Sequence, residues 1–465
     1  MKELLKQIPK VDKILSDPLF ESYSKKYDSA VLVSFIQKEL DVIRQEILKK
    51  SHWIKREDFV KRIADQIDRE LVPFTRKAVN GTGIVMNTGL GRAPFSENAV
   101  IAAEEVMRGY CTLEVDVKTG KRGRREDGIS NLISLITGAE AATVVNNNAA
   151  AVFICINTLS NRKEAVISRG ELVEIGGSFR MPDIIKKSGA KMKEVGATNK
   201  TKLSDYKDAL SSRTGALLKV HSSNYRIEGF TQEVSLKELA GFARRNGVLL
   251  YYDLGGGIFG ELSKYGLPHE PTVSEAVRDG ADVFSFSGDK VLGGPQCGII
   301  AGRKDIIEKI KKNPLMRVLR LDKVRLALLE ETLKYFITKD PFDSGHATLK
   351  LLSEKRPSLK KKTQELVRLI KATVPQSWKV CAEDVFDQAG SGAMPTEKLK
   401  GAAVSIVPEG LSVTALSEMM RTVSNVPIFG YINNERYYLS LRTIFENDFP
   451  IICGNLEKIC LRIRS

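Results

Sequence analysis

The chain has 465 residues, more than one hydrophobic core usually serves, so we expect a large domain with smaller domains appended. A formal net charge of +15 favours a polyanionic partner without establishing one. The six cysteines contain no CxxC pair, which argues against a disulfide framework and a metal site, and no apolar run reaches membrane-spanning length. The first residues lack the apolar core of a signal peptide, so we expect a cytoplasmic protein.

Residues 1–75 are predicted to form a separate helical domain. Apolar residues recur at helical spacing within residues 29–50 and again within residues 59–71, and Pro73 marks the exit from this domain. Its modest excess of basic residues suits either a solvated face or a surface that binds a nucleic-acid backbone.

Two loops rich in glycine or basic residues follow this helical domain. The first, residues 80–94, lets the backbone approach a ligand closely and places Arg92 beside it. The second, residues 118–126, has five basic residues and suits a flexible loop that contacts phosphate. A solvated connector explains either loop equally well, so these residues alone leave both interpretations open.

From Thr137 onwards, short apolar runs alternate with helical stretches. Repeated βα units predict an α/β fold with a mostly parallel sheet and helices on both faces. In such sheets a ligand binds beyond the carboxyl ends of the strands. The predicted strands are residues 141–145, 165–167, 191–195, 216–220, 248–252, 283–286 and 299–301.

Two polar groups directly follow predicted strands. The turn Asn146-Asn147-Asn148-Ala149 leads into a helix. Free backbone amides at a helix start would receive an anion, although asparagines that cap the helix are a sufficient structural explanation. Asp253 precedes three glycines, where its carboxylate either caps a turn or pairs with the cation of a ring nitrogen.

Lys290 lies on a turn between two predicted strands. It is either a solvated loop lysine or a Schiff-base lysine, because a desolvated amine loses proton affinity and becomes a nucleophile towards an aldehyde. Ser287 is placed to bond a cofactor phosphate, and the turn at residues 293–295 leaves room for a bulky ligand. The succession of anion cup, Asp253 and Lys290 resembles the large domain of fold type I pyridoxal phosphate (PLP) enzymes, the aspartate aminotransferase-like fold.

The last third of the sequence adds two arginines and a smaller domain. Arg317 and Arg320 are three residues apart, so on a helix they share one face and either clamp a tetrahedral anion or remain two surface arginines. A basic helix near residues 350–371 and a hairpin within residues 427–441, with its turn at Asn433-Asn434, indicate a smaller α/β region. The predicted domains are residues 1–75, a helical domain; 76–340, a PLP-binding core; and 341–465, a small α/β domain.

Seven runs of the sequence carry a family pattern. They are residues 90–94, 118–123, 145–152, 168–180, 219–225, 286–296 and 317–323. Together they resemble the bacterial selenocysteine synthases, the L-seryl-tRNA(Sec) selenium transferases. Three departures from the pattern, at Gly89, Thr112 and Ala197, concern local loop contacts and subunit association and leave the chemistry in place.

The resemblance implies a PLP-dependent reaction on serine esterified to tRNA(Sec). Loss of water would give an aminoacrylyl-tRNA, to which selenium from selenophosphate is added. Lys290 would carry the cofactor and remove the α-proton, Asp289 would orient Lys290 or its proton, and Asp253 would keep the ring nitrogen protonated.

The resemblance also implies where the other reactants bind. Arg92, Arg317 and Arg320 match positions that hold the phosphate-like selenium donor, and three guanidinium groups suit a multiply charged anion. The N-terminal helices would recognise tRNA, and the chains would assemble as a homo-oligomer, a ring of dimers that forms a decamer.

An alternative function is that of a PLP-dependent β-lyase or a cysteine desulfurase acting on a free amino acid. A desulfurase needs a nucleophilic cysteine on a mobile loop, for which Cys381 is the only loose candidate, and a free amino acid leaves the basic N-terminal domain without a role. A tRNA-binding protein without catalysis would be expected to lose Lys290 first, and Lys290 is present.

Overall fold

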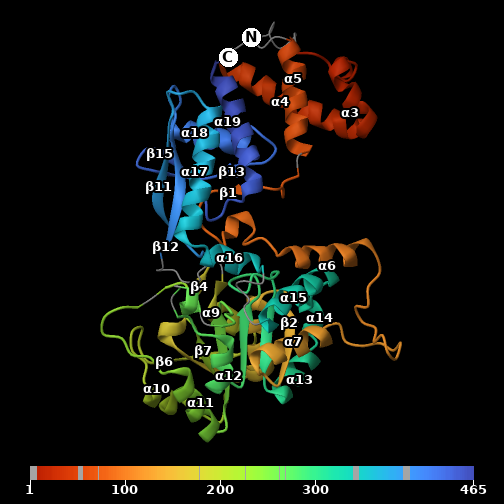
Figure 1. Cartoon of the computed structure of the whole chain (residues 1–465). Coiled ribbons are helices and arrows are strands. Elements are labelled where there is room, and N and C mark those ends of the chain that lie inside the picture. The colour runs from red at the N-terminus through yellow and green to blue at the C-terminus, as the bar shows by residue number, and fades with distance from the viewer. Residues whose placement is uncertain are drawn as a thin grey trace. The chain divides into compact units, whose positions relative to one another are not determined.

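The chain divides into two units (Figure 1). The first comprises Met1–Ala78 with Ser424–Pro427, and the second comprises Val79–Val423 with Ile428–Ser465. The computed structural model describes residues 8–50, 56–71, 73–176, 179–225, 227–260, 262–265, 267, 269–338, 345–390 and 398–464.

The first unit is built from amphipathic helices, as the spacing of its apolar residues predicts. Its two long helices are α4 (Ser29–Lys50) and α5 (Arg56–Leu71), and the shorter α2 (Val11–Leu15) and α3 (Glu21–Lys26) precede them. Their apolar faces meet in one core. The buried core residues are Ile14, Phe20, Leu32, Ile36, Leu40, Val60, Ile63, Ala64 and Ile67.

One arginine links the two long helices at the edge of this core. The guanidinium of Arg62 on α5 donates from Nε to Glu39 Oε1 at 2.8 Å and from Nη1 to Glu46 Oε2 at 2.7 Å. Both carboxylates lie on α4. The pKa of Arg62 is raised, chiefly by the hydrogen bond to Glu46, so the pair stays charged and fixes the packing of α5 on α4.

A seven-stranded sheet forms the centre of the second unit. Its strand order is β2-β10-β9-β8-β7-β3-β6, and β10 runs antiparallel to both of its neighbours while the other pairs are parallel. This confirms the predicted α/β class with a mostly parallel sheet. The strands are β2 (Ala141–Val145), β3 (Glu164–Ser168), β6 (Lys191–Val195), β7 (Thr214–Val220), β8 (Leu249–Gly255), β9 (Val283–Ser287) and β10 (Gly298–Gly302).

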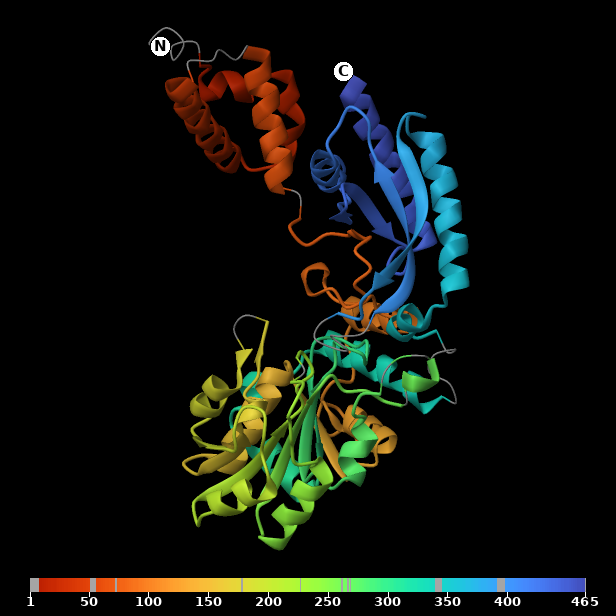
Figure 2. The ribbon, with the colours of Figure 1, turned by 90° about the vertical axis from the view of Figure 1, so that its left-hand side faces the viewer.

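Helices cover both faces of the large sheet (Figure 2). One face packs against α8, α9 and α13, and the other packs against α7, α10, α11, α12 and α15. Because most of the strand residues are buried from both sides, the sequence reads as short continuous apolar runs. These helices are α7 (Asp127–Thr137), α8 (Asn148–Ser160), α9 (Met181–Lys187), α10 (Leu203–Ala209), α11 (Leu236–Arg245), α12 (Val273–Arg278), α13 (Lys304–Lys312) and α15 (Lys323–Lys334).

A four-stranded antiparallel sheet of order β11-β12-β15-β14 forms the C-terminal part of this unit. The predicted hairpin is present, but its turn lies one residue later than predicted, because Asn433 pairs with Arg436. The two turn residues, Asn434 and Glu435, have positive φ angles of 46° and 56°, as a type I′ turn requires. The basic helix α17 packs on β11 and β12. The elements are α16 (Ala347–Ser353), α17 (Arg356–Thr373), β11 (Lys379–Asp387), β12 (Leu399–Val407), α18 (Val413–Thr422), β14 (Tyr431–Asn433), β15 (Arg436–Ser440) and α19 (Phe449–Arg464).

A buried ion pair joins this second sheet to α16. Arg442 Nε donates to Asp387 Oδ2 at 2.9 Å, and both side chains are almost completely buried. The same guanidinium donates from Nη1 to the carbonyls of Leu351 at 2.9 Å and Glu354 at 3.2 Å. Asp387 also accepts from Ser440 Oγ at 2.6 Å, so the hydrogen-bonding groups of this buried pair are well satisfied.

The first residues of the second unit pack on the C-terminal sheet. β1 (Val79–Asn80) pairs in parallel with β13 (Ile428–Phe429), and the Val85 and Met86 amides donate to the carbonyls of Gln388 and Ala389 at 3.0 and 2.8 Å. The predicted boundaries at residues 75/76 and 340/341 stay predictions.

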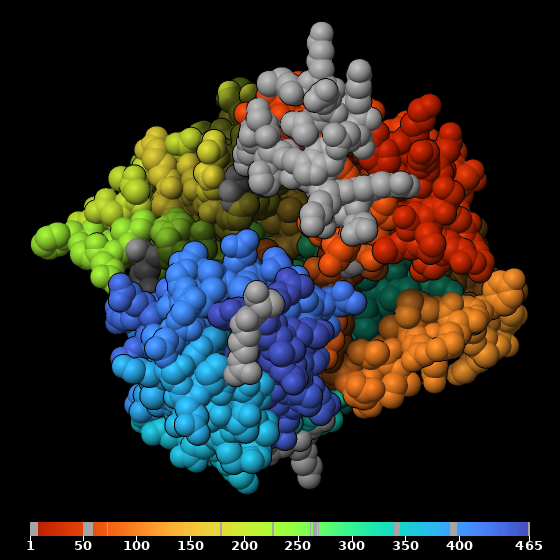
Figure 3. Space-filling view, turned by 90° about the horizontal axis from the view of Figure 1, so that it is seen from above, coloured from red at the N-terminus to blue at the C-terminus, as the bar shows by residue number. Residues whose placement is uncertain are grey.

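An arm, residues 109–126, follows α6 (Glu97–Arg108) and forms an outer edge of this unit (Figures 1 and 3). An isolated bridge between Val115 and Arg122 holds it together. Large apolar side chains are exposed on α6 and on the arm, namely Val100, Ile101, Met107, Tyr110, Val115 and Val117. No helix among the described residues is long and apolar enough to cross a membrane.

Candidate active site

Asp253 is fixed near the carboxyl end of β8, next to the start of α8. Its Oδ1 accepts hydrogen bonds from Asn148 Nδ2 at 2.8 Å and from the Gly255 amide at 3.0 Å. Asn148 Oδ1 in turn accepts from Ser285 Oγ at 2.8 Å. Burial raises the pKa of Asp253, while the bonds from Asn148 and Gly255 and the charge of Lys290 oppose that rise. The carboxylate is therefore preorganised beside a strand end, where a cation would stabilise its charged form.

The start of α8 is the predicted anion cup. Asn147 caps the helix through its side chain, which accepts from the Ala150 amide at 2.8 Å, and the Asn146 amide donates to the Leu319 carbonyl at 2.8 Å. The helix start therefore offers a ligand the amides of Asn148 and Ala149. The three asparagines thus have three different tasks, which the sequence did not distinguish.

Lys290 is 7% exposed and lies on the loop that follows β9. Burial lowers its pKa, the charges of Asp253 and Asp289 oppose that effect, and the charge of Arg92 adds to it. Ser287, at the end of β9, is also 7% exposed. The structure thus favours the buried, reactive lysine over the solvated loop lysine.

The Lys290 loop is held by a hydrogen bond within its own backbone and by His346, a contact that the sequence did not predict. The Gly293 amide donates to the Lys290 carbonyl at 2.8 Å, and His346 Nε2 lies 2.9 Å from the Leu292 carbonyl. Gly293 has a φ of 65°, and a Cβ there would collide with Thr348 and His346. Only glycine therefore fits this turn without strain.

His346 is neutral and holds a single tautomer. Its Nε2 must donate, because its partner is a carbonyl, and its Nδ1 accepts from the Leu349 amide at 3.3 Å. Burial lowers its pKa to about 4. His346 therefore caps α16 and anchors the Lys290 loop at the same time.

Arg92 places its guanidinium group beside Asp289 in the same site. Its Nε lies 3.4 Å from Asp289 Oδ2, and its backbone has a φ of 72°. Nη1 is buried, and no hydrogen-bond partner for it exists among the residues that the structure describes. This buried donor is therefore open to an acceptor atom of a ligand.

Arg317 and Arg320 lie beside the start of α8, where the Asn146 amide donates to the carbonyl of the intervening Leu319. Arg317 is on α14 (Met316–Leu319), Arg320 directly follows it, and both line a pocket of about 290 Å³. The other lining residues are Arg124, Arg125, Glu126, Asp127, Glu308, Lys311, Lys312 and Met316. None of the groups around Lys290 belongs to this pocket, so the joint role of the three arginines stays a prediction.

Comparisons with known proteins decide which family these residues serve. The family model described as L-seryl-tRNA selenium transferase matches residues 78–445. The chain is 41% identical over 461 residues to an L-seryl-tRNA(Sec) selenium transferase of Carboxydothermus hydrogenoformans, with 98% of both chains covered. The protein of the same name from Alkaliphilus metalliredigens is 42% identical over 463 residues, again with 98% of each covered.

The chain belongs to the L-seryl-tRNA selenium transferase family. A solved structure of D-glucosaminate-6-phosphate ammonia-lyase is 18% identical, with a TM-score of 0.58, and covers 86% of this chain and 99% of its own. This likeness concerns the fold, which is that of fold type I PLP enzymes, as predicted. Members of the selenium transferase family are PLP-dependent transferases, so PLP is the cofactor.

The residues around Lys290 fit PLP in three respects. A buried amine of lowered pKa is available for an aldehyde, a buried carboxylate for a ring nitrogen, and helix-start amides for a phosphate. These groups come from the ends of β9, β8 and β2, which the strand order brings to one edge of the sheet. The roles of the individual residues remain predictions.

Proposed function

We propose that the chain converts L-seryl-tRNA(Sec) to L-selenocysteinyl-tRNA(Sec), with selenophosphate as the selenium donor. The observation that carries this proposal is the buried Lys290 between Asp253, Asp289 and Arg92 in a chain of this family. PLP, when bound, withdraws electrons from the substrate α-carbon and makes its proton more acidic.

The residues supply what that chemistry requires. The lowered pKa of Lys290 shifts its balance towards the neutral amine, the form that attacks an aldehyde and accepts a proton. Asp253, held by Asn148, presents a carboxyl group whose charged form a protonated ring nitrogen would stabilise. Asp289 lies next to Lys290 in sequence and acts on its charge, so it is suited to orient the ammonium.

The selenium donor requires cationic groups, for which two clusters are suited. Arg92 has a buried, unpartnered Nη1 beside Asp289, and Arg317 and Arg320 line the basic pocket near α14. We propose that Arg92, Arg317 and Arg320 bind selenophosphate. One chain holds the two clusters in different pockets. Binding of one donor by all three arginines therefore requires that a neighbouring chain supply Arg317 and Arg320.

Assembly and tRNA recognition belong to the same proposal. The exposed apolar side chains of α6 and the arm support a homo-oligomer, for which we propose a ring of dimers that forms a decamer. The N-terminal helical unit is proposed to bind the tRNA backbone. A substrate that belongs to translation would place the enzyme in the cytoplasm.

The decisive experiment supplies purified protein and PLP with seryl-tRNA(Sec) and selenophosphate and measures selenocysteinyl-tRNA(Sec). We expect product from the wild type and none from Lys290→Ala. If the wild type instead released pyruvate from free serine or sulfur from free cysteine and left seryl-tRNA(Sec) unchanged, the alternative β-lyase or desulfurase function would replace this one.

A further inference from the structure

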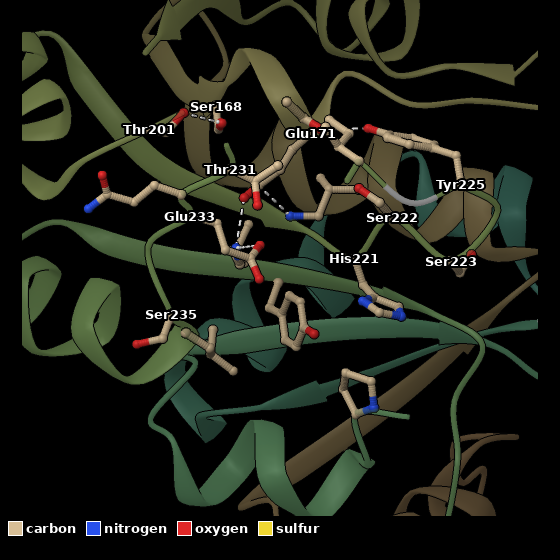
Figure 4. Close-up of a pocket in the computed structure, with 18 of the residues that line it drawn as sticks. Ser168, Glu171, Thr201, His221, Ser222, Ser223, Tyr225, Thr231, Glu233 and Ser235 are labelled. Carbon is tan, nitrogen blue, oxygen red and sulfur yellow. Dashed lines mark hydrogen bonds and ion pairs between the residues drawn. The ribbon is translucent and has the colours of Figure 1, made fainter. Parts of the chain in front are cut away.

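A cavity of about 530 Å³ lies at the carboxyl ends of β3 and β7 (Figure 4). Its lining includes Ser168, Glu171, Lys219 and His221, from the two sequence runs 168–180 and 219–225, to which the active site gives no role. Lys290, Asp289 and Arg92 do not line it. The volume falls in the usual range of small-molecule sites.

The lining of the cavity is rich in carboxylates, from the buried Glu171 to the exposed Glu233. Lys219 Nζ lies 2.8 Å from Glu171 Oε1 and 3.2 Å from Glu233 Oε2, so its charge is already neutralised. His221 Nε2 lies 3.0 Å from Glu270 Oε2. Five carboxylates line the cavity, against two lysines and two histidines, which disfavours a phosphate inside it. A neutral ligand rich in hydroxyl and amino donors suits such a lining.

The cavity lining also includes the buried hydroxyl group of Ser223. Ser223 is 5% exposed, and its Oγ has no hydrogen-bond partner among the residues that the structure describes. The hydroxyl of Ser222 and the amide side chain of Gln232 belong to the same lining. A buried, unpaired hydroxyl is costly, so its retention indicates a bound polar partner.

The mouth of the cavity differs from its interior. Phe230, next to the lining residue Thr231, is 87% exposed, and Lys200 Nζ lies 6.0 Å from the centre of its ring. The Phe230 carbonyl accepts from Asn199 Nδ2 at 2.7 Å, which fixes the loop. An exposed aromatic ring beside a lysine is the combination that stacks a nucleobase and attracts its phosphate.

The cavity adjoins the candidate active site through β7. The His221 amide donates to the Asp253 carbonyl at 2.8 Å, and Ser223 Oγ would lie 3.2 Å from a Cβ placed on Gly255. A ligand in the cavity therefore lies next to the strand end that carries Asp253.

We propose that this cavity binds the 3′-terminal nucleoside of the aminoacylated RNA. The inference rests on the proposed function, because serine is esterified to that nucleoside and must reach Lys290. The carboxylates accept hydrogen bonds from ribose hydroxyl and base amino groups. Phe230 stacks a base at the mouth, and Lys200 contacts the phosphate that precedes the nucleoside.

The test measures binding of the full-length protein to two acceptor-stem RNA hairpins by fluorescence anisotropy. One hairpin ends in CCA and the other lacks only the terminal adenosine. We expect Phe230→Ala to weaken binding of the complete hairpin by about tenfold, the usual order for a lost stacking partner, and of the shortened hairpin by less than twofold. Thr231→Trp, which fills the cavity, should show the same selectivity.

Phe386→Ala is the matched control. Phe386 is 64% exposed and lies 5.7 Å from Lys398 Nζ, but it is on β11 of the other sheet, so its loss should leave both affinities unchanged. If Phe230→Ala and Thr231→Trp weakened binding of both hairpins equally, or of neither, the cavity would not bind the terminal nucleoside. The proposed function would stand in that case, provided that the wild type still makes selenocysteinyl-tRNA. If the wild type bound neither hairpin and made no product, both proposals would fall.

Discussion

The pH dependence of folding stability tests the role of His346. Burial lowers its pKa from 6.5 to about 4, so the unfolded chain binds this proton more readily than the folded one. The stability contribution is complete above pH 6.5 and is lost as the pH falls towards 4. Since one pKa unit corresponds to about 1.4 kcal/mol, the loss between pH 7.5 and pH 4.5 is about 2.5 kcal/mol.

The assay is urea unfolding of wild type and His346→Gln at both pH values. The variant lacks the titrating group, so its free energy of unfolding should fall by about 2.5 kcal/mol less than that of the wild type over this pH interval. His269→Gln, at a side chain that is 63% exposed, is the control and should behave like the wild type. Parallel pH profiles of His346→Gln and wild type would refute the buried neutral imidazole.

Further predictions concern the cofactor, the donor, the ion pair and the RNA. Lys290→Ala should lose the borohydride-reducible visible absorbance of bound PLP, and persistence of that band would contradict covalent attachment. Arg317→Ala should keep the band but abolish selenium incorporation, with poor rescue by Arg317→Lys; loss of the band would place Arg317 at the cofactor. Asp387→Asn should lower the free energy of unfolding by about 3–5 kcal/mol, more than the double replacement Asp387→Leu with Arg442→Met, and the reverse order in urea unfolding would count against the pair. Affinity for tRNA should fall steeply between 50 and 200 mM salt, and a flat profile would exclude backbone contacts.

The chain order of the site could be predicted from the sequence because each part lies at the end of a strand. Asn146 and Lys290 come after β2 and β9, and Asp253 lies near the end of β8; these three strands run in the same direction, so their carboxyl ends lie at one edge. Apolar runs and turn residues are local signals. They were sufficient for the fold class and for the hairpin at residues 431–440.

Long-range side-chain contacts could not be predicted in this way. Asn148 looks like part of a helix cap, yet Asn147 alone caps α8 and Asn148 holds Asp253. One signal for a second role was present in the sequence: three consecutive asparagines stand where a helix cap needs only one. His346 is far from Leu292 in the sequence, so no local pattern reveals their contact. The pocket that contains Arg317 likewise depends on how α13 and the arm pack.

The short helix α16 is held at both ends. His346 at its start holds the Leu292 carbonyl, two residues after Lys290, and the guanidinium of Arg442 holds the carbonyls of Leu351 and Glu354 at its end. α16 therefore connects the C-terminal sheet to the Lys290 loop. The position of Lys290 thus depends on contacts made by the last quarter of the chain as well as on the large sheet.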